Sequence, residues 1–212
     1  MINSTDDIWV KYIEHVIGSE AGLSKDQGDP AAACNPGLYH TNRGVTFCTF
    51  KAKAASLGIT PVTYDRFLKL STKDAAKFMY SYYTAVNGNK LPDTIALQVT
   101  EAAWGSGPGA ANNLLIKSLS DIGVKAATTA QAYKLANTVD EKKLYDSITK
   151  RRYLWLDKLS NQPKYKKYKK GWLDRQTRFT NLFAPFASKK KISNGFINFD
   201  NFIRYLFNQG GF

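Results

Sequence analysis

The chain has 212 residues, 43% of them apolar, so it can bury a substantial core as one large domain or two small ones. Its 30 basic and 17 acidic residues give a net charge of +13, which favours polyanionic partners such as nucleic acid, anionic lipid or bacterial wall polymers. The sequence contains no apolar run of about 18 residues, the length that a helix needs to span a bilayer. The first residues also lack the basic end and apolar core of a signal peptide, so a substrate outside the cytoplasm would require another export route.

Apolar residues recur at helical spacing through most of the chain and predict a mainly α protein with at most a small hairpin. The first helix follows Ser4 and delivers Glu20 at its C-terminal end. Glycines and prolines between 21 and 50 predict loops and a hairpin that ends at Val45-Thr46-Phe47. Further helices are expected over 51–57, 62–69, 72–86, 93–104, 110–120, 128–136, 140–159 and about 171–183. The glycine cluster at 105–109 lacks the following Lys-Ser/Thr of a phosphate-binding loop, so it predicts a turn between helices.

Basic residues gather in the last quarter of the chain, at 164–170 and 189–191. Interleaved basic and aromatic side chains can bind a single nucleic-acid strand. A solvated helix face whose tyrosines pack inward explains the same pattern better. Affinity for wall polymers ranks between these two explanations. We therefore predict no nucleic-acid partner. Beyond 184 the chain becomes an aromatic and basic extension. Its apolar residues fit one helix face, which is more often a packing surface than a membrane anchor: Phe199, Phe202, Ile203, Leu206 and Phe207.

The two cysteines, Cys34 and Cys48, bracket a short segment. A disulfide between them would contribute about 3 kcal/mol by closing a short loop, but burial as free thiols fits the sequence equally well. The only histidines are His15 and His40, and no ligands are spaced as a zinc site requires. We therefore predict no metal and no cofactor.

Glu20, Asp29 and Thr41 form a constellation suited to glycosidic hydrolysis. One carboxylic acid must protonate the departing sugar oxygen, and a second group must align water or stabilise the charge that develops on the sugar. Taken singly, each residue has an ordinary explanation, since a glutamate after a helix can simply be solvated and Asp29 before Pro30 is a common turn residue. His40 is an alternative base, although a histidine in a loop is usually only solvated.

These motifs resemble glycoside hydrolase family 108, the phage-type N-acetylmuramidases, over most of residues 6–180. The family pattern Glu-Gly-Gly-Tyr, Asp and Thr-Asn-x-Gly-Ile-Thr corresponds here to Glu20-Ala21-Gly22-Leu23, Asp29 and Thr41-Asn42-Arg43-Gly44-Val45-Thr46. The Glu-to-Asp spacing is kept, but the spacer between Asp29 and Thr41 is longer than in the family. Downstream, 104–111 resemble the family's glycine-rich turn. Gly171-Trp172-Leu173-Asp174-Arg175 resembles the Gly-Trp-Leu-x-Arg signature of a helical region usually labelled peptidoglycan-binding.

The resemblance implies a lysozyme-like protein of two lobes with a cleft between them. Residues 1–90 would form the catalytic lobe, 91–183 the helical lobe and 184–212 the extension. The implied reaction is hydrolysis of the β-1,4 bond between N-acetylmuramic acid and N-acetylglucosamine. Glu20 would be the general acid, Asp29 would stabilise the sugar cation or orient water, and Thr41 would hold that water. Substrate-binding residues are expected at Tyr39, Asn42 and Trp104.

The partner implied by the resemblance is bacterial peptidoglycan, with other virion proteins as candidates for the extension. The protein would act on the periplasmic side or the wall, after release from the host cytoplasm or carriage in a virion. Two alternatives stay open. One is a lytic transglycosylase, which needs the acid but no activated water. The other is a non-catalytic wall-binding or virion structural protein in which the long spacer has disabled the site.

Overall fold

The computed structural model describes residues 4–20 and 22–187 of the chain. These residues are mainly helical with one small antiparallel sheet, which confirms the predicted fold class. They form two compact units. The helical unit comprises residues up to 12 and from 81 onward, and the sheet unit comprises residues 13–80. Two helices, α1 (Ser4–Ser19) and α4 (Thr72–Ala85), contribute residues to both units. The predicted apolar face at 199–207 lies outside the described residues.

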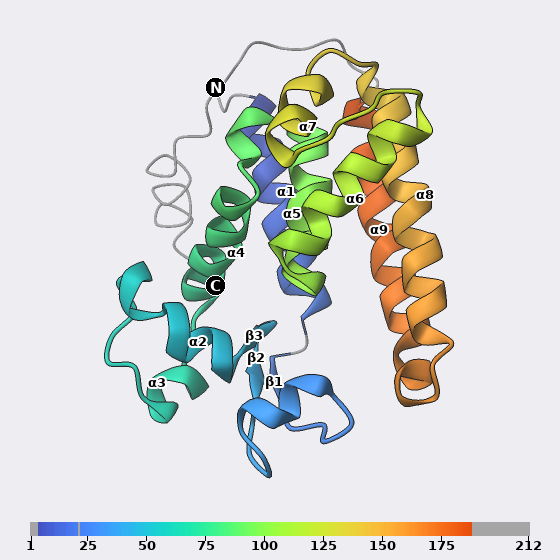
Figure 1. The fold of residues 1–212 in the computed structure, drawn as a ribbon. Coiled ribbons are helices and arrows are strands. Elements are labelled where there is room, and N and C mark those ends of the chain that lie inside the picture. The colour runs from blue at the N-terminus through green and yellow to red at the C-terminus, as the bar shows by residue number, and fades with distance from the viewer. Residues whose placement is uncertain (1–3, 21, 188–212) are drawn as a thin grey trace. The chain divides into compact units, whose positions relative to one another are not determined.

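The helical unit is built around α5 (Asp93–Ser106), in which every residue from Thr94 to Ala103 is buried. A helix that is buried on all sides must be surrounded by other elements. The helices that pack against α5 are α6 (Pro108–Asp121), α8 (Glu141–Ser160) and α9 (Lys169–Ala187), as Figure 1 shows. A short 3-10 turn, η3 (Gly88–Lys90), leads into α5, and α7 (Thr129–Ala136) packs against α6.

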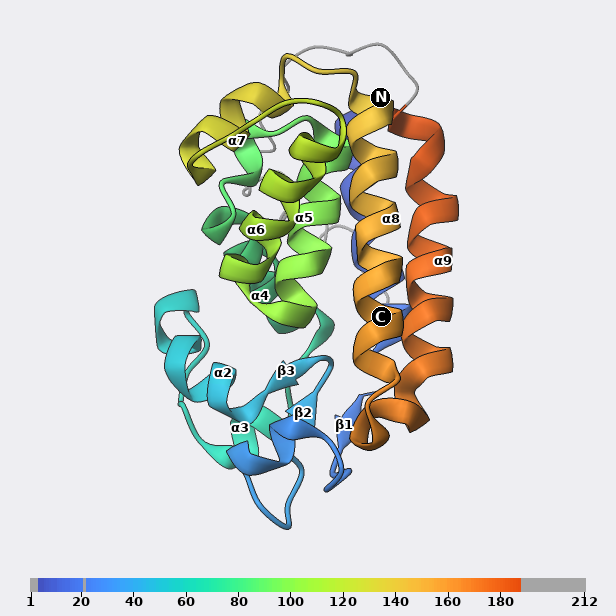
Figure 2. The same ribbon diagram turned by 45° about the vertical axis from the view of Figure 1, so that its right-hand side comes forward.

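Two long helices, α8 and α9, lie side by side and antiparallel, joined by the 3-10 turn η4 (Pro163–Tyr168) (Figure 2). In η4 the rings of Tyr165 and Tyr168 pack on Trp172, with centroids 5.7 and 5.6 Å away, while the lysines between them are exposed. The prediction of inward-packing tyrosines is therefore confirmed. α9 runs to Ala187, past its predicted end near 183, so the compositional change at 184 falls inside a helix.

The turn between α5 and α6 is much tighter than the five-residue break predicted from the glycine cluster. α5 continues through Ser106 and α6 begins at Pro108, so Gly107 alone separates them. Gly107 has φ 84° and ψ 155°, a positive-φ conformation that glycine adopts without a steric penalty. Proline suits the first helical position because its ring fixes φ and no hydrogen bond from its nitrogen is required there.

The sheet unit contains three two-residue strands in the order β1 (Leu23–Ser24), β2 (Thr41–Asn42), β3 (Val45–Thr46). β2 and β3 form the predicted hairpin, whereas β1 was not predicted. Phe47 is not part of the hairpin, contrary to the prediction, because it opens α2 (Phe47–Lys53). The reason is that Thr46 Oγ1 accepts a hydrogen bond of 3.2 Å from the backbone nitrogen of Thr49 and so caps that helix.

An aromatic cluster fills the core of the sheet unit around α2, the 3-10 turn η2 (Ala55–Leu57) and α3 (Tyr64–Leu68). Phe50 and Phe67 are fully buried with ring centroids 5.5 Å apart, and Phe78 lies 6.5 Å from Phe50. A capping arrangement opens α4: Asp74 Oδ2 accepts hydrogen bonds from the backbone and hydroxyl of Ser71, and Arg66 pairs with the same oxygen at 2.8 Å.

A disulfide joins Cys34 to Cys48, with their Cα atoms 5.2 Å apart. It decides between the two alternatives that the sequence left open. Cys34 is the last residue of the 3-10 turn η1 (Pro30–Cys34), and Cys48 lies in the first turn of α2. The bridge therefore fixes the segment after Asp29 to the helix that follows the hairpin.

None of the helices in the described part of the chain combines the length and the hydropathy that a bilayer crossing requires.

Candidate active site

The β2–β3 hairpin is the scaffold of the candidate site. Its two central residues, Arg43 and Gly44, have φ values of 48° and 74°, so both are left-handed as in a type I′ turn. Arg43 is held in this uncommon conformation from two sides. Its backbone nitrogen donates to the Gly22 carbonyl at 3.1 Å, and its Nε donates to the Leu70 carbonyl at 3.0 Å. The hairpin is thus joined both to the segment after α1 and to the end of α3.

Glu20 follows α1 directly and its side chain is half-buried. The backbone just after it is held against the hairpin. Gly22 accepts the hydrogen bond from Arg43, and Ser24 in β1 pairs with Thr41 in β2. Glu20 therefore stands at the entrance of one strand, and Thr41 lies on the neighbouring strand. Glu20 lies three residues before the strand that pairs with the strand of Thr41, so the pairing of β1 with β2 links the segments that carry the two candidates.

Asp29 caps η1. Its Oδ1 accepts a hydrogen bond of 2.8 Å from the backbone nitrogen of Ala31, and its own backbone nitrogen donates to the Asp26 carbonyl at 2.9 Å. Its side chain is half-buried, and among the described residues no donor bonds its second oxygen, Oδ2. The capping bond fixes the orientation of the carboxyl group and leaves one oxygen for water or substrate. Asp29 thus has the structural role that a turn aspartate usually has, and this role is compatible with a catalytic one.

Thr41 is paired with His40, which is fully buried. Thr41 Oγ1 lies 3.0 Å from His40 Nδ1, and His40 Nε2 lies 3.1 Å from the Asp26 carbonyl oxygen. A carbonyl oxygen only accepts hydrogen bonds, so Nε2 carries a proton and donates it. In the neutral imidazole Nδ1 is then the acceptor, and the Thr41 hydroxyl donates to it. The expectation that His40 is solvated was therefore wrong.

The direction of the Thr41 hydroxyl has a chemical consequence. Because its proton is directed to His40, its lone pairs are left to accept a hydrogen bond from another donor. A water molecule bound to Thr41 would donate one proton to Oγ1 and keep its own lone pairs for an electrophile.

His40 and Asp26 were missed as residues that brace the site. Only Asp26 had a local signal, since Asp26-x-Gly28 is the pattern of an Asx turn, and Asp26 Oδ1 does accept from Gly28 at 2.9 Å.

The predicted substrate-binding residues differ in their surroundings. Asn42 is 4% exposed, and its Nδ2 donates to the carbonyls of Phe67 and Leu68 at 2.8 and 3.1 Å, so it fastens β2 to α3. The backbone of Tyr39 bonds the Tyr64 hydroxyl, while its half-buried ring faces Lys25 Nζ at 5.6 Å. Substrate binding by either residue stays a prediction.

Trp104 belongs to the helical unit, whereas the other five predicted site residues all lie in the sheet unit. Its indole ring makes an edge-to-face contact with Tyr82, with ring centroids 5.4 Å apart. This contact fixes the ring within the helical unit, and a role for Trp104 in binding sugar also stays a prediction. The described residues include no group of three or more histidine, cysteine, aspartate or glutamate side chains arranged to hold a metal ion.

Comparison with known proteins is consistent with this geometry. Residues 13–107 match the model of the family Glycosyl hydrolase 108, and this range contains Glu20, Asp29 and Thr41. Among solved structures, the chain is similar to the "Structure of Brucella abortus SagA", with 21% identity, a TM-score of 0.65, and coverage of 87% of this chain and 98% of that one. At this identity the similarity shows the fold alone. No curated protein gives a significant match. The match over residues 13–107 supports a glycosyl hydrolase 108 domain in this part of the chain, and with it a glycoside hydrolase.

Proposed function

We propose that the protein cleaves the β-1,4 bond between N-acetylmuramic acid and N-acetylglucosamine in bacterial peptidoglycan. Peptidoglycan is the substrate that the family assignment supports. The observation that carries the finer proposal is the arrangement of the sheet unit. Glu20 lies three residues before β1, Thr41 lies in the paired strand β2, and Asp29 is held in the loop between these strands by its contacts with Asp26 and η1.

Glu20 is the general acid in this mechanism. Its carboxyl proton passes to the glycosidic oxygen as the bond from that oxygen to the anomeric carbon breaks, which leaves a hydroxyl on the departing sugar. Positive charge then develops on the ring of the remaining sugar. The Asp29 carboxylate faces this charge or orients the attacking water through Oδ2, the oxygen that its capping bond does not use.

Thr41 holds the attacking water. Its hydroxyl proton bonds His40 Nδ1, so Oγ1 accepts one proton of the water and directs the water lone pair outward. Attack on the anomeric carbon releases the second proton of the water to a carboxylate. If Asp29 takes that proton, the anomer is inverted, whereas a nucleophilic carboxylate retains it. Proton NMR of the newly formed reducing end distinguishes the two outcomes.

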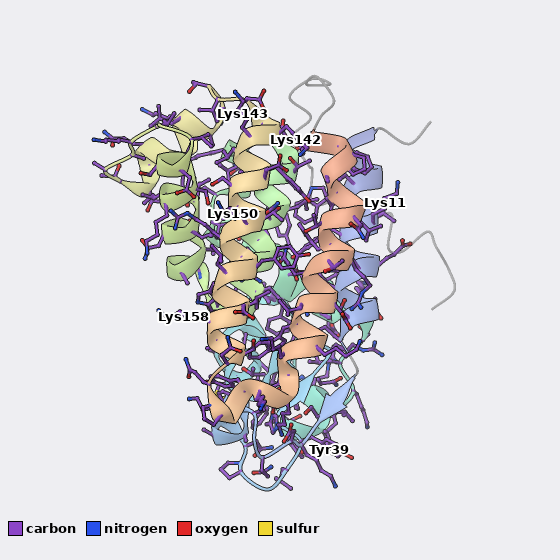
Figure 3. The ribbon with its side chains drawn as sticks, turned by 90° about the vertical axis from the view of Figure 1, so that its right-hand side faces the viewer. Lys11, Tyr39, Lys142, Lys143, Lys150 and Lys158 are labelled. Atoms are coloured by element: carbon purple, nitrogen blue, oxygen red, sulfur yellow. A yellow bond between two sulfur atoms is a disulfide. The ribbon has the colours of Figure 1, made fainter. Side chains whose placement is uncertain are left out.

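Two features outside the site support action on the bacterial wall. Disulfides persist in oxidising compartments rather than in the cytosol, so the Cys34–Cys48 bridge suits a protein that works at the wall. The net charge of +13 favours binding to anionic wall polymers. Figure 3 shows part of this charge spaced along α8, at Lys142, Lys143 and Lys150. A role in phage lysis or wall penetration completes the proposal and rests on the family resemblance.

Mass spectrometry of peptidoglycan digested by wild type and by Glu20→Gln tests the proposal. We expect reducing muramic ends from wild type and a loss of roughly 10²–10⁴-fold in rate for Glu20→Gln, because the amide cannot give up a proton. The matched control is Glu14→Gln, which removes the same charge from an exposed position of α1. Anhydro-muramic ends would identify a lytic transglycosylase instead. Bound but uncleaved wall with wild type would leave a non-catalytic binding protein.

A further inference from the structure

A pocket of about 150 Å³ opens in the helical unit between α5, α8 and α9. Its lining includes three charged side chains, Glu101, Arg152 and Arg175, and two indole rings, Trp155 and Trp172. Trp172 and Arg175 belong to the Gly-Trp-Leu-x-Arg signature. The hydrolysis proposed above gives these two residues no task, so the pocket requires its own explanation.

Glu101 at this pocket is already paired. Its Oε1 accepts a hydrogen bond of 2.7 Å from Arg175 Nε, and its Oε2 accepts from Arg175 Nη2 at 3.3 Å and from the Tyr12 hydroxyl at 3.2 Å. The Glu101 side chain is only 5% exposed. A two-pronged arginine contact satisfies a buried carboxylate well. Arg152 is therefore not needed to complete this ion pair.

Arg152 is the unusual member of the group. It is 8% exposed, and among the described residues nothing accepts a hydrogen bond from its Nε. Its guanidinium carbon lies 5.3 Å from the Trp155 ring centroid, so the indole holds the guanidinium in place. Burial lowers the pKa of Arg152 and the nearby Glu101 carboxylate raises it. Arginine remains charged in proteins, so Arg152 carries a buried positive charge close to the Glu101–Arg175 pair.

We propose that this pocket binds the terminal carboxylate of a short peptide, with the Arg152 guanidinium as its partner and the indoles of Trp155 and Trp172 against the adjoining side chain. A buried donor without an acceptor is unfavourable, and a carboxylate is the ligand group that best matches a guanidinium. Trp155 is 40% exposed, so a ligand can reach the pocket from solvent.

The size of the pocket decides between a peptide end and a sugar. A cavity of about 150 Å³ is known to hold a molecule as large as benzene, whereas pockets for larger ligands measure about 300–1,000 Å³. A terminal alanine-sized residue therefore fits, and a disaccharide does not. Peptidoglycan carries peptides with free carboxylates. Naming the wall as the natural source rests on the proposed function, but the affinity of the pocket for a peptide carboxylate does not.

Titration of the ¹⁵N-labelled full chain with D-alanyl-D-alanine tests the proposal. The Arg152 Nε–H signal, identified by its absence in Arg152→Met, and the indole signals of Trp155 and Trp172 should shift together with a Kd on the order of 1 mM. The matched ligand is the same dipeptide with a C-terminal amide, which lacks the charge. The matched variant is Lys158→Met, which removes one positive charge from an exposed position on α8.

We expect Arg152→Met to weaken binding at least tenfold and Lys158→Met to weaken it less than twofold, with the amide bound at least tenfold more weakly than the acid. The Tm of Arg152→Met without ligand should equal or exceed that of wild type, because the change removes a buried donor without a partner. Equal affinity of Arg152→Met and wild type would overturn the proposal, as would equal affinity for the acid and the amide or for acetate and the dipeptide. A fall in Tm of Arg152→Met with unchanged dipeptide binding would show a purely structural arginine.

The dipeptide has no glycosidic bond, so this result is independent of the digestion experiment. Cleavage of the wall without dipeptide binding would leave the proposed hydrolysis standing and refute the pocket. Dipeptide binding without cleavage of the wall would support the pocket and refute the proposed hydrolysis.

Discussion

Removal of the Cys34–Cys48 disulfide should destabilise the protein by an amount that the loop length predicts. The two cysteines are 14 positions apart, so the bridge closes a loop of about 15 residues. The chain-entropy relation gives about 3 kcal/mol for a loop of this length at 25 °C. The double variant Cys34→Ser/Cys48→Ser should therefore lose about 3 kcal/mol of unfolding free energy relative to the oxidised wild type.

The effect on activity should be much smaller than the effect on stability. The same loop keeps other contacts, among them the hydrogen bond from Asn35 Nδ2 to the Tyr39 carbonyl at 3.0 Å and that between His40 and Asp26. The disulfide acts mainly by restricting the unfolded chain, so the folded variant should retain its wall-cleaving rate within about threefold well below its Tm.

Urea unfolding followed by circular dichroism, together with initial rates on labelled peptidoglycan, measures both quantities. Wild type treated with dithiothreitol is the matched control, because Cys48 is exposed and its bridge is open to reduction. Reduced wild type and the double variant should agree. A loss of stability below about 0.5 kcal/mol would refute the loop-closure argument. A collapse of activity in a variant that circular dichroism shows to be folded would mean that the bridge itself positions Asp29.

Three further predictions concern single residues. Thr41→Val keeps the side-chain shape but removes the hydroxyl bonded to His40, so the hydrolysis rate should fall about 10–100-fold while Thr41→Ser keeps most of it; initial rates on labelled wall decide. Burial, and then the Glu141 carboxylate, raises the pKa of Asp93 to about 6, so the stability it contributes is full below about pH 4 and is lost as the pH rises to about 6. Asp93→Asn should therefore raise the unfolding free energy by up to about 3 kcal/mol at pH 8 and hardly change it at pH 4. Urea unfolding at both pH values measures the change, and equal changes at pH 4 and pH 8 would contradict the prediction. Glu101→Gln removes the buried carboxylate that pairs with Arg175 and should cost about 3–5 kcal/mol in urea unfolding. A change below 1 kcal/mol would show that water already solvates the pair.

The helices were predictable because their apolar spacing reflects burial. α5 is the clearest case: its residues from Ile95 to Ala103 are all buried and, apart from Gln98, Thr100 and Glu101, apolar. The predicted helix needed only two more residues at its end. The start of α2 was missed because Val45-Thr46-Phe47 reads equally well as a strand. A capping bond to Thr49 decides that Phe47 belongs to the helix, and a threonine three residues later is a weaker signal than a glutamate or glutamine.

The sequence identifies candidate site residues but not the contacts that hold them in place. Glu20 and Asp29 keep a spacing that resembles the family, and this spacing is local in the sequence. The orientation of the Thr41 hydroxyl depends on the tautomer of His40, which in turn depends on the carbonyl of Asp26, 14 positions earlier. The disulfide had the same difficulty, since two cysteines are equally compatible with free thiols. Contacts of this kind need the folded chain, because no sequence period encodes them.

The longer spacer between Asp29 and Thr41 is the feature that most favoured a disabled enzyme, and the structure weakens that alternative. Lengthening a flexible loop adds a closure cost that grows only slowly, roughly 0.6 kcal/mol per doubling, so extra residues alone need not disturb the site. Here the spacer is also held along its length: η1 and the disulfide fix its first part, Asn35 its middle and His40 its end. The residues that lengthen the loop thus include the one that orients Thr41. Shortening the spacer to the family length by deleting His40 and residues before it, with Thr41 kept, should therefore lower activity. A spacer that only obstructs the site would give higher activity on deletion.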